Sequence, residues 1–260
     1  MPARRPPPLA ALAALATALA LALAGCGGDS TMDRPEKAAT LVLDFQPNAV
    51  HAGIALADAR DYDGAEGVAL RVQAPSSSTD AVKLLLAGRA TFAVLDIHDL
   101  ALARARGRDL VGVMALVQRP LAAVLAQPAI RRPRDLAGRR VGVTGVPSDD
   151  AVLRAIVAGD GGDARAVRKV TIGFQAVSAL LARRVDGATA FWNVEGVALR
   201  ERRPRARVFR LDEFGAPSYP ELVLCVTRRT LDDETPVVRA TVRALRRGYD
   251  EAIADPESAL

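Results

Sequence analysis

The residues best suited to binding chemistry follow a short apolar run at 188–191. Trp192, the only tryptophan of the chain, comes next, and Asn193 and Glu195 follow within three positions. A flat heteroaromatic ring could stack on the indole while its exocyclic N–H groups donate to the Glu195 carboxylate. The alternative is a core tryptophan with a solvated glutamate beyond it, because tryptophan is seldom fully buried.

Polar side chains also follow two apolar runs earlier in the chain. The turn after 40–45 offers Asn48 and His51, and the loop 74–79 presents Ser76, Ser77 and Ser78. Hydroxyls and free N–H groups at a helix start suit a polar or anionic group. Asn48 could equally be an N-cap, and capping needs only one of the loop's hydroxyl groups.

Three further candidates lie at the ends of other segments. Asp96 ends the run 91–95, Ser148 stands at a helix start, and Tyr219 comes just before the run 222–227. Tyr219 could supply a second aromatic face for a ring. It is equally typical of an ordinary loop.

The sequence lacks the motifs that are typical of several kinds of catalytic site. The sequence has no Gly-x-x-x-x-Gly-Lys phosphate loop, no Gly-x-Ser-x-Gly elbow and no cysteines at metal-binding spacing. His51 and His98 are the only histidines. The segment Asp96-Ile-His98-Asp99 could hold a metal, but a helix start with an acid near its N-terminus is the commoner arrangement, with His98 incidental. Without a relay or an activated nucleophile, the pattern favours a binding protein over an enzyme.

The elements that position these residues alternate between strand and helix. Strand-like runs lie at 40–45, 68–72, 91–95, 109–117, 121–126, 140–144, 167–172, 187–191, 206–211 and 222–227, and a long amphipathic helix covers about 234–254. This alternation predicts an α/β protein with parallel sheets flanked by helices. Ligands in such folds settle where strands end and helices begin, which is where the candidate residues fall.

An internal similarity predicts two related α/β lobes. Residues 81–89 align without gaps with 176–184, and the segment 42–53 mirrors 141–153. We expect one lobe at 39–127 and 222–260 and a second at 128–221. Two lobes joined by two strands can close like a hinge on a ligand lying between them.

The first residues have the pattern of an export signal. Arg4 and Arg5 precede an Ala/Leu-rich run, and Leu23-Ala-Gly-Cys26 closes it. This ending resembles a bacterial lipobox, so residues 1–25 are expected to be a lipoprotein signal peptide and Cys26 the lipidated first residue. Residues 26–38, polar with Gly, Asp, Ser and Pro, are expected to be a flexible tether.

Charge and cysteine content narrow the partners further. The formal net charge is +5, and removal of Arg4 and Arg5 with the signal leaves +3. The arginines are scattered and no aromatic residues interleave with them, so nucleic acid is not expected as a partner. Cys225 lies in an apolar run, which favours a buried, unreactive thiol.

The motifs at Leu43–Gly53, Pro75–Ser78 and Phe191–Gly196 resemble periplasmic solute-binding proteins of ABC importers. The branch includes binders of thiamine pyrimidine precursors and is related to the eukaryotic pyrimidine synthases of thiamine biosynthesis. The resemblance implies a type II periplasmic-binding-protein fold, with a ligand such as a formylated aminomethylpyrimidine between its lobes. The ring would stack on Trp192 and meet Glu195, with Asn48 and His51 at the opposite wall.

The resemblance also implies how the protein works. It would be a monomer, held at the extracytoplasmic face of a bacterial membrane by its lipid. It would capture its ligand without altering it and without a cofactor, and pass it to a membrane permease with a separate ATPase. Two alternatives stay open: a pyrimidine-synthase-like enzyme, or a binder of riboflavin, a sulfonate or nitrate.

Overall fold

The computed structural model describes residues 36–257. The signal peptide expected at 1–25, the lipidation site Cys26 and most of the tether lie outside the described residues. The described residues all belong to one compact unit. Within 36–257, no helix combines the length and apolarity needed to cross a membrane.

The first strand starts inside the segment expected to be a tether. The backbone N–H of Lys37 donates to Gly67 (3.0 Å), and Ala38 pairs with Ala69 on the neighbouring strand. A tether, if present, therefore extends no further than residue 36, because the next two residues are already part of a sheet.

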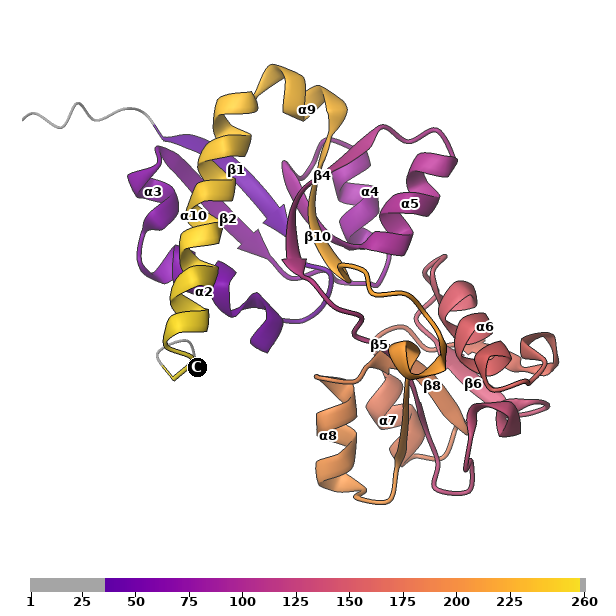
Figure 1. Cartoon of the computed structure of the whole chain (residues 1–260). Coiled ribbons are helices and arrows are strands. Elements are labelled where there is room, and N and C mark those ends of the chain that lie inside the picture. The colour runs from indigo at the N-terminus through magenta and orange to yellow at the C-terminus, as the bar shows by residue number, and fades with distance from the viewer. Residues whose placement is uncertain (1–35, 258–260) are drawn as a thin grey trace, which may run out of the picture. The chain divides into compact units, whose positions relative to one another are not determined.

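The strands form two five-stranded sheets with corresponding orders, β2-β1-β3-β10-β4 and β7-β6-β8-β5-β9 (Figure 1). The central strand β3 matches β8, and the segments 81–89 and 176–184, which align in the sequence, precede these two strands. The bounds are β1 Lys37–Val42, β2 Val68–Gln73, β3 Phe92–Asp96, β4 Leu110–Val117, β5 Ala122–Ala126, β6 Arg140–Val143, β7 Arg168–Thr171, β8 Gly187–Phe191, β9 Arg207–Arg210 and β10 Leu222–Thr227.

The sequence predicts parallel sheets, but in each sheet one strand runs antiparallel to its two neighbours. β10 runs antiparallel to β3 and β4, and β5 runs antiparallel to β8 and β9. The cause is the route of the chain, which reaches β5 and β10 directly from the other sheet. Each of these strands enters its sheet at the end where the parallel strands finish, so it must run the opposite way.

Helices cover both faces of each sheet (Figure 1). On β3, Phe92 and Val94 pack with α2 and α10, whereas Ala93 and Leu95 pack with α4 and α5. The second sheet packs against α6 on one face and against α7 and α8 on the other. The α-helices are α2 Ala52–Ala59, α3 Tyr62–Ala65, α4 Asp80–Leu86, α5 Ile97–Ala105, α6 Asp149–Gly159, α7 Ala176–Leu181, α8 Glu195–Arg202, α9 Arg228–Asp233 and α10 Thr235–Ala254.

The contact between helices α10 and α2 depends on a glycine. A Cβ atom at Gly248 of α10 would lie 2.0 Å from the carbonyl oxygen of Gly53 and 2.9 Å from the backbone nitrogen of Ala57, both on α2. We expect Gly248→Ala to lower the free energy of unfolding by about 1–3 kcal/mol, because the two helices must move apart. Urea denaturation measures the change, and Arg239→Ala on the exposed side of α10 is the control. Equal stability of both variants would contradict this contact.

Candidate functional site

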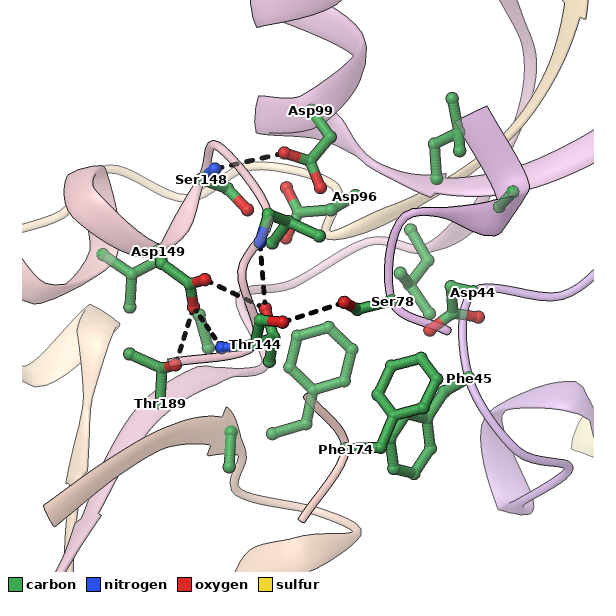
Figure 2. A pocket seen from close by; sticks show the side chains of 18 of the residues that line it. Asp44, Phe45, Ser78, Asp96, Asp99, Thr144, Ser148, Asp149, Phe174 and Thr189 are labelled. Atoms are coloured by element: carbon green, nitrogen blue, oxygen red, sulfur yellow. Dashed lines mark hydrogen bonds between the residues drawn. The ribbon is translucent and has the colours of Figure 1, made fainter. Parts of the chain in front are cut away.

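A pocket lies between the two sheets, at the carboxyl ends of β1, β3, β6 and β8 (Figure 2). The space between its walls measures about 790 Å³, including the part open to solvent. This position is the one expected for a ligand in an α/β fold, because strand ends there present loops and helix starts. The polar and aromatic residues of the lining are Asp44, Phe45, Ser78, Asp96 and Asp99 from the first sheet's side, and Thr144, Ser148, Asp149, Phe174, Thr189, Phe191 and Glu195 from the second's.

Two hydrogen bonds cross the pocket from one side to the other. The Ser78 hydroxyl donates to the carbonyl oxygen of Thr144 (2.8 Å), and the backbone N–H of Ser148 donates to the Asp99 carboxylate (3.1 Å). Figure 2 shows both contacts as dashed lines. They hold the loop before α4 and the start of α5 against the loop between β6 and α6.

Aromatic rings form the opposite part of the wall. Phe45, which follows β1, meets Phe174, which follows β7, edge to face with ring centroids 4.6 Å apart (Figure 2). Phe191 at the end of β8 also lines the pocket. A flat ring could therefore find apolar contacts from both sides of the pocket.

Asp149 organises the wall on the second sheet's side. Its carboxylate accepts hydrogen bonds from the backbone N–H groups of Thr144 (3.2 Å) and Gly145 (2.7 Å) and from the hydroxyls of Thr144 (3.0 Å) and Thr189 (2.7 Å). The side chain is buried. Asp149 thus fixes the loop after β6 against β8, and its own oxygens are already satisfied.

Carboxylates dominate the charge of the pocket. Asp44, Asp96, Asp99, Asp149 and Glu195 all line it, and no lysine, arginine or histidine does so among the residues that the structure describes. Such a lining attracts N–H donors and positive charge, and it repels anions.

Burial shifts the protonation of two of these acids. Desolvation, with the nearby charge of Asp96, raises the pKa of Asp99 to about 7. Desolvation, with a smaller contribution from Asp44, raises the pKa of Glu195 to about 7. Near neutral pH each of these two groups therefore interconverts readily between its acid and its anion.

These shifts predict how stability depends on pH. A carboxyl whose pKa is about 7 in the fold and about 4 in the unfolded chain binds a proton more tightly when folded. Its contribution to stability is complete below pH 4 and is lost as the pH rises to about 7. We expect the urea midpoint of the ligand-free protein to fall between pH 5 and pH 8, and to fall less in Glu195→Gln and Asp99→Asn. A midpoint that rises over this range would contradict the shifts.

Four of the residues singled out from the sequence line the pocket: Ser78, Asp96, Ser148 and Glu195. Ser78 and Ser148 make the crossing contacts described above. Glu195 is the first residue of α8. Its carboxylate accepts a hydrogen bond from the backbone N–H of Phe191 (3.2 Å). These four lie where a strand ends or a helix begins, which is the signal that selected them.

Asn48 and His51 lie outside the lining. The Asn48 side chain accepts from the backbone N–H of Val50 (3.0 Å), so its N-cap interpretation is confirmed. His51 is buried, and its Nε2 lies 2.8 Å from the Asp44 carboxylate. His51 therefore positions a residue of the pocket.

Ser76 and Ser77 also lie outside the lining and are exposed. Both donate to the Asp80 carboxylate through their backbone N–H and hydroxyl groups. These bonds lower the pKa of Asp80 to about 2. The two serines thus organise the loop that presents Ser78.

Trp192 and Asn193 are not among the lining residues either. The indole N–H of Trp192 donates to the carbonyl oxygen of Pro120 (3.1 Å), and the guanidinium of Arg210 lies 4.3 Å from the ring centroid. The Oδ1 atom of Asn193 is buried without a hydrogen-bond partner. Phe191, which directly precedes Trp192, lines the pocket instead.

Tyr219 lies behind the pocket rather than in its lining. Its ring meets the His98 ring edge to face at 4.7 Å, and its hydroxyl is 3.5 Å from the Glu221 carboxylate. Asp96 caps α5 by accepting from the backbone N–H of His98 (2.7 Å), which confirms the helix-start interpretation. His98 is not incidental, however, because its Nδ1 lies 2.8 Å from the same carboxylate.

Cys225 is fully buried, and desolvation raises the pKa of its thiol to about 12. The expected burial of this thiol is confirmed.

Sequence reasoning missed several residues of the pocket. Asp44, Phe45 and Phe174 come two or three residues after the end of a strand, and a search of the loops that follow strands could have found them. Asp99 and Thr189 carried no such signal. Asp99 reaches the pocket from within α5, and Thr189 lies inside β8.

The sequence is similar to that of a known protein family and of several individual proteins. Residues 48–259 match the family model described as NMT1/THI5 like. A formylaminopyrimidine-binding protein from Halalkalibacterium halodurans is 30% identical over 244 residues, covering 92% of this chain and 74% of the relative. A 4-amino-5-hydroxymethyl-2-methylpyrimidine phosphate synthase from Legionella pneumophila is 24% identical over 230 residues, covering 85% and 71%.

Solved structures show the same fold at low sequence identity. The alkanesulfonate-binding protein SsuA from Xanthomonas axonopodis superposes with a TM-score of 0.70 at 16% identity, covering 85% of this chain and 76% of that one. The periplasmic nitrate-binding protein NrtA from Synechocystis gives a TM-score of 0.66 at 11% identity, covering 82% and 61%. The chain therefore has the periplasmic-binding-protein fold.

Proposed function

Because the chain belongs to the NMT1/THI5-like family, we propose that it is the solute-binding protein of an ABC importer and captures a thiamine pyrimidine precursor. The relative that is 30% identical is named for binding a formylaminopyrimidine. A formylated aminomethylpyrimidine is a flat ring that carries amino and amide N–H groups.

The observation that carries this proposal is the composition of the pocket. Its charged residues are all acidic within the described part of the chain, and its aromatic residues are Phe45, Phe174 and Phe191. The phenylalanines suit the faces of a small ring, and the carboxylates suit its N–H groups. A sulfonate or nitrate would instead face acidic side chains with no lysine, arginine or histidine among the described lining residues to pair with, so the pocket favours the pyrimidine over the anions named for the structural neighbours.

Glu195 is the group best placed to receive the ring's donors. It is held at the start of α8 by the N–H of Phe191, and burial keeps its pKa near 7. A bound ring with N–H groups would favour the charged form of the carboxylate. Asp44, whose charge acts on Glu195, comes from the first sheet's side.

Capture would follow from the position of the pocket between the sheets. A ligand that touches residues of both sides stabilises the arrangement in which they are close, by as much as it binds that arrangement more tightly than the open one. A permease and a separate ATPase would recognise that arrangement. Lipidation of Cys26 would hold the protein at the extracytoplasmic face of the membrane.

A pyrimidine synthase is the second candidate, because several relatives carry that name at 22–24% identity. The buried thiol of Cys225 supports binding over catalysis, since a thiol with a raised pKa is a poor nucleophile.

The test is a thermal-shift screen with formylated aminomethylpyrimidine, riboflavin, an alkanesulfonate and nitrate. A ligand that binds only the folded state raises the melting temperature. We expect a rise with the pyrimidine alone. After long incubation, mass spectrometry should recover the pyrimidine unchanged. A rise with the sulfonate or nitrate would refute the proposed ligand, and an altered pyrimidine would favour the synthase.

A further inference from the structure

A cluster of three metal-binding side chains lies behind the pocket. Asp96 ends β3, His98 is in the first turn of α5, and Glu221 directly precedes β10. One ligand atom from each, a carboxylate oxygen or a ring nitrogen, lies within 4.8 Å of the other two. The chain brings Glu221 to this place from more than a hundred residues away.

Glu221 provides a second, independent observation. The residue has no exposed surface, and its Oε2 accepts from the backbone N–H groups of Leu121 and Ala122 (2.8 Å for Ala122). Its Oε1 is buried without any hydrogen-bond partner. A buried carboxyl oxygen that lacks a partner is unfavourable, so a cation bound at this atom would be stabilising.

No basic side chain supplies that charge in full. Among residues 36–257, neither Asp96 nor Glu221 forms an ion pair with a lysine or an arginine, and His98 is the single basic partner of Asp96. Two carboxyl groups facing each other therefore share one imidazole. A bound cation would replace a proton held within this group of three side chains.

We propose that Asp96, His98 and Glu221 bind one divalent transition-metal ion, of which Zn²⁺ is the simplest example. One imidazole nitrogen with two carboxylate oxygens is a donor set for Zn²⁺ or Mn²⁺ rather than for Ca²⁺. His98 Nδ1 and Asp96 Oδ1 lie 2.8 Å apart in a hydrogen bond. A tetrahedral ion at about 2.0–2.2 Å from each atom would place them about 3.3–3.6 Å apart, so the two side chains must separate slightly when the ion binds. The ion would take the place of the proton between them.

The position of the site gives the ion a structural consequence. Glu221 already joins the two connections between the sheets, because it precedes β10 and accepts from the residues that begin β5. An ion held by Glu221 would tie both connections to β3 and α5. Asp96 also lines the pocket, so the ion would stand beside the bound ring.

The experiment uses the full chain, freed of metal with EDTA and titrated with Zn²⁺ in a calorimeter. We expect one ion per chain. His98→Gln and Glu221→Gln should each weaken binding by about 100-fold or more, since outer-shell changes alone weaken metal sites by 10–100-fold. Co²⁺ is a second probe, and its visible absorption should appear with the wild type and be lost in both variants.

His51 offers a matched control within the chain. It also lies 2.8 Å from a carboxylate, that of Asp44, but it belongs to no group of three metal-binding residues among those described. His51→Gln should therefore leave the affinity for Zn²⁺ unchanged. Melting temperatures measured in EDTA identify any variant that fails to fold, and Asp96→Asn then replaces it. The proposal is overturned if Zn²⁺ does not saturate one site, if binding survives substitution of both His98 and Glu221, or if it is lost with His51.

Discussion

Glu195→Gln should weaken binding of formylated aminomethylpyrimidine by at least tenfold, and by as much as about 100-fold, while the protein stays folded. A hydrogen bond to a charged group contributes about 1.5–3 kcal/mol, and the amide cannot carry the negative charge that receives the ring's donors. One oxygen remains in glutamine to accept from the backbone N–H of Phe191, as in the wild type. Calorimetric titration gives the affinity, and the melting temperature reports the fold.

Glu201→Gln is the matched control for this prediction. Glu201 lies on the same helix, α8, and is exposed. Its substitution removes the same charge from the protein without touching the pocket. If the two variants bind the pyrimidine equally well, Glu195 is not the acceptor of the ring.

Asp149→Ala should destabilise the protein by about 4 kcal/mol or more and abolish measurable ligand binding. The carboxylate receives four hydrogen bonds from Thr144, Gly145 and Thr189, and its removal leaves these donors without a partner in a buried site. Thr144 and Thr189 line the pocket, so their displacement alters its wall. Urea denaturation measures the loss of stability.

The neighbouring residue provides the comparison for Asp149. Asp150 is in the same first turn of α6, but it is exposed, and Lys169 is its one ion-pair partner among residues 36–257. Asp150→Ala should change the free energy of unfolding by no more than about 0.5 kcal/mol, as is usual for surface positions. A similar small effect of Asp149→Ala would show that the network does not support the loop.

The positions of strands and helices could be predicted closely from the sequence because apolar runs and capping residues are local signals. The correspondence of the two sheet orders could also be anticipated, since the aligned segments 81–89 and 176–184 precede β3 and β8. The direction of β5 and β10 could not. It depends on the path by which the chain crosses between sheets, and no local pattern encodes that path.

The aromatic wall shows where local reasoning stops. Phe191 and Trp192 are adjacent, and successive side chains of a strand point to opposite sides. The sequence shows that an aromatic residue ends β8, but the register that turns Phe191 towards the pocket and Trp192 towards Pro120 is set by pairing with β5. Which of these two aromatic side chains lines the pocket can therefore be predicted only when the pairing of the strands is known.

Contacts between distant segments account for the other differences. His51 was predicted at the pocket wall, but it contacts Asp44, which lines the wall in its place. Asp99 and Ser148 are joined by a bond between α5 and α6, and Glu221 meets Asp96 and His98 only after folding. The sequence presents these residues singly, so their grouping cannot be predicted without the fold.

We propose that the acidic pocket selects a ring rich in N–H groups. The most direct measurement is a calorimetric titration of the wild-type protein, first with formylated aminomethylpyrimidine and then, in a separate cell, with ethanesulfonate. Saturable one-to-one binding of the pyrimidine and no heat from the sulfonate is the predicted result. Binding of the sulfonate with no binding of the pyrimidine would contradict the account.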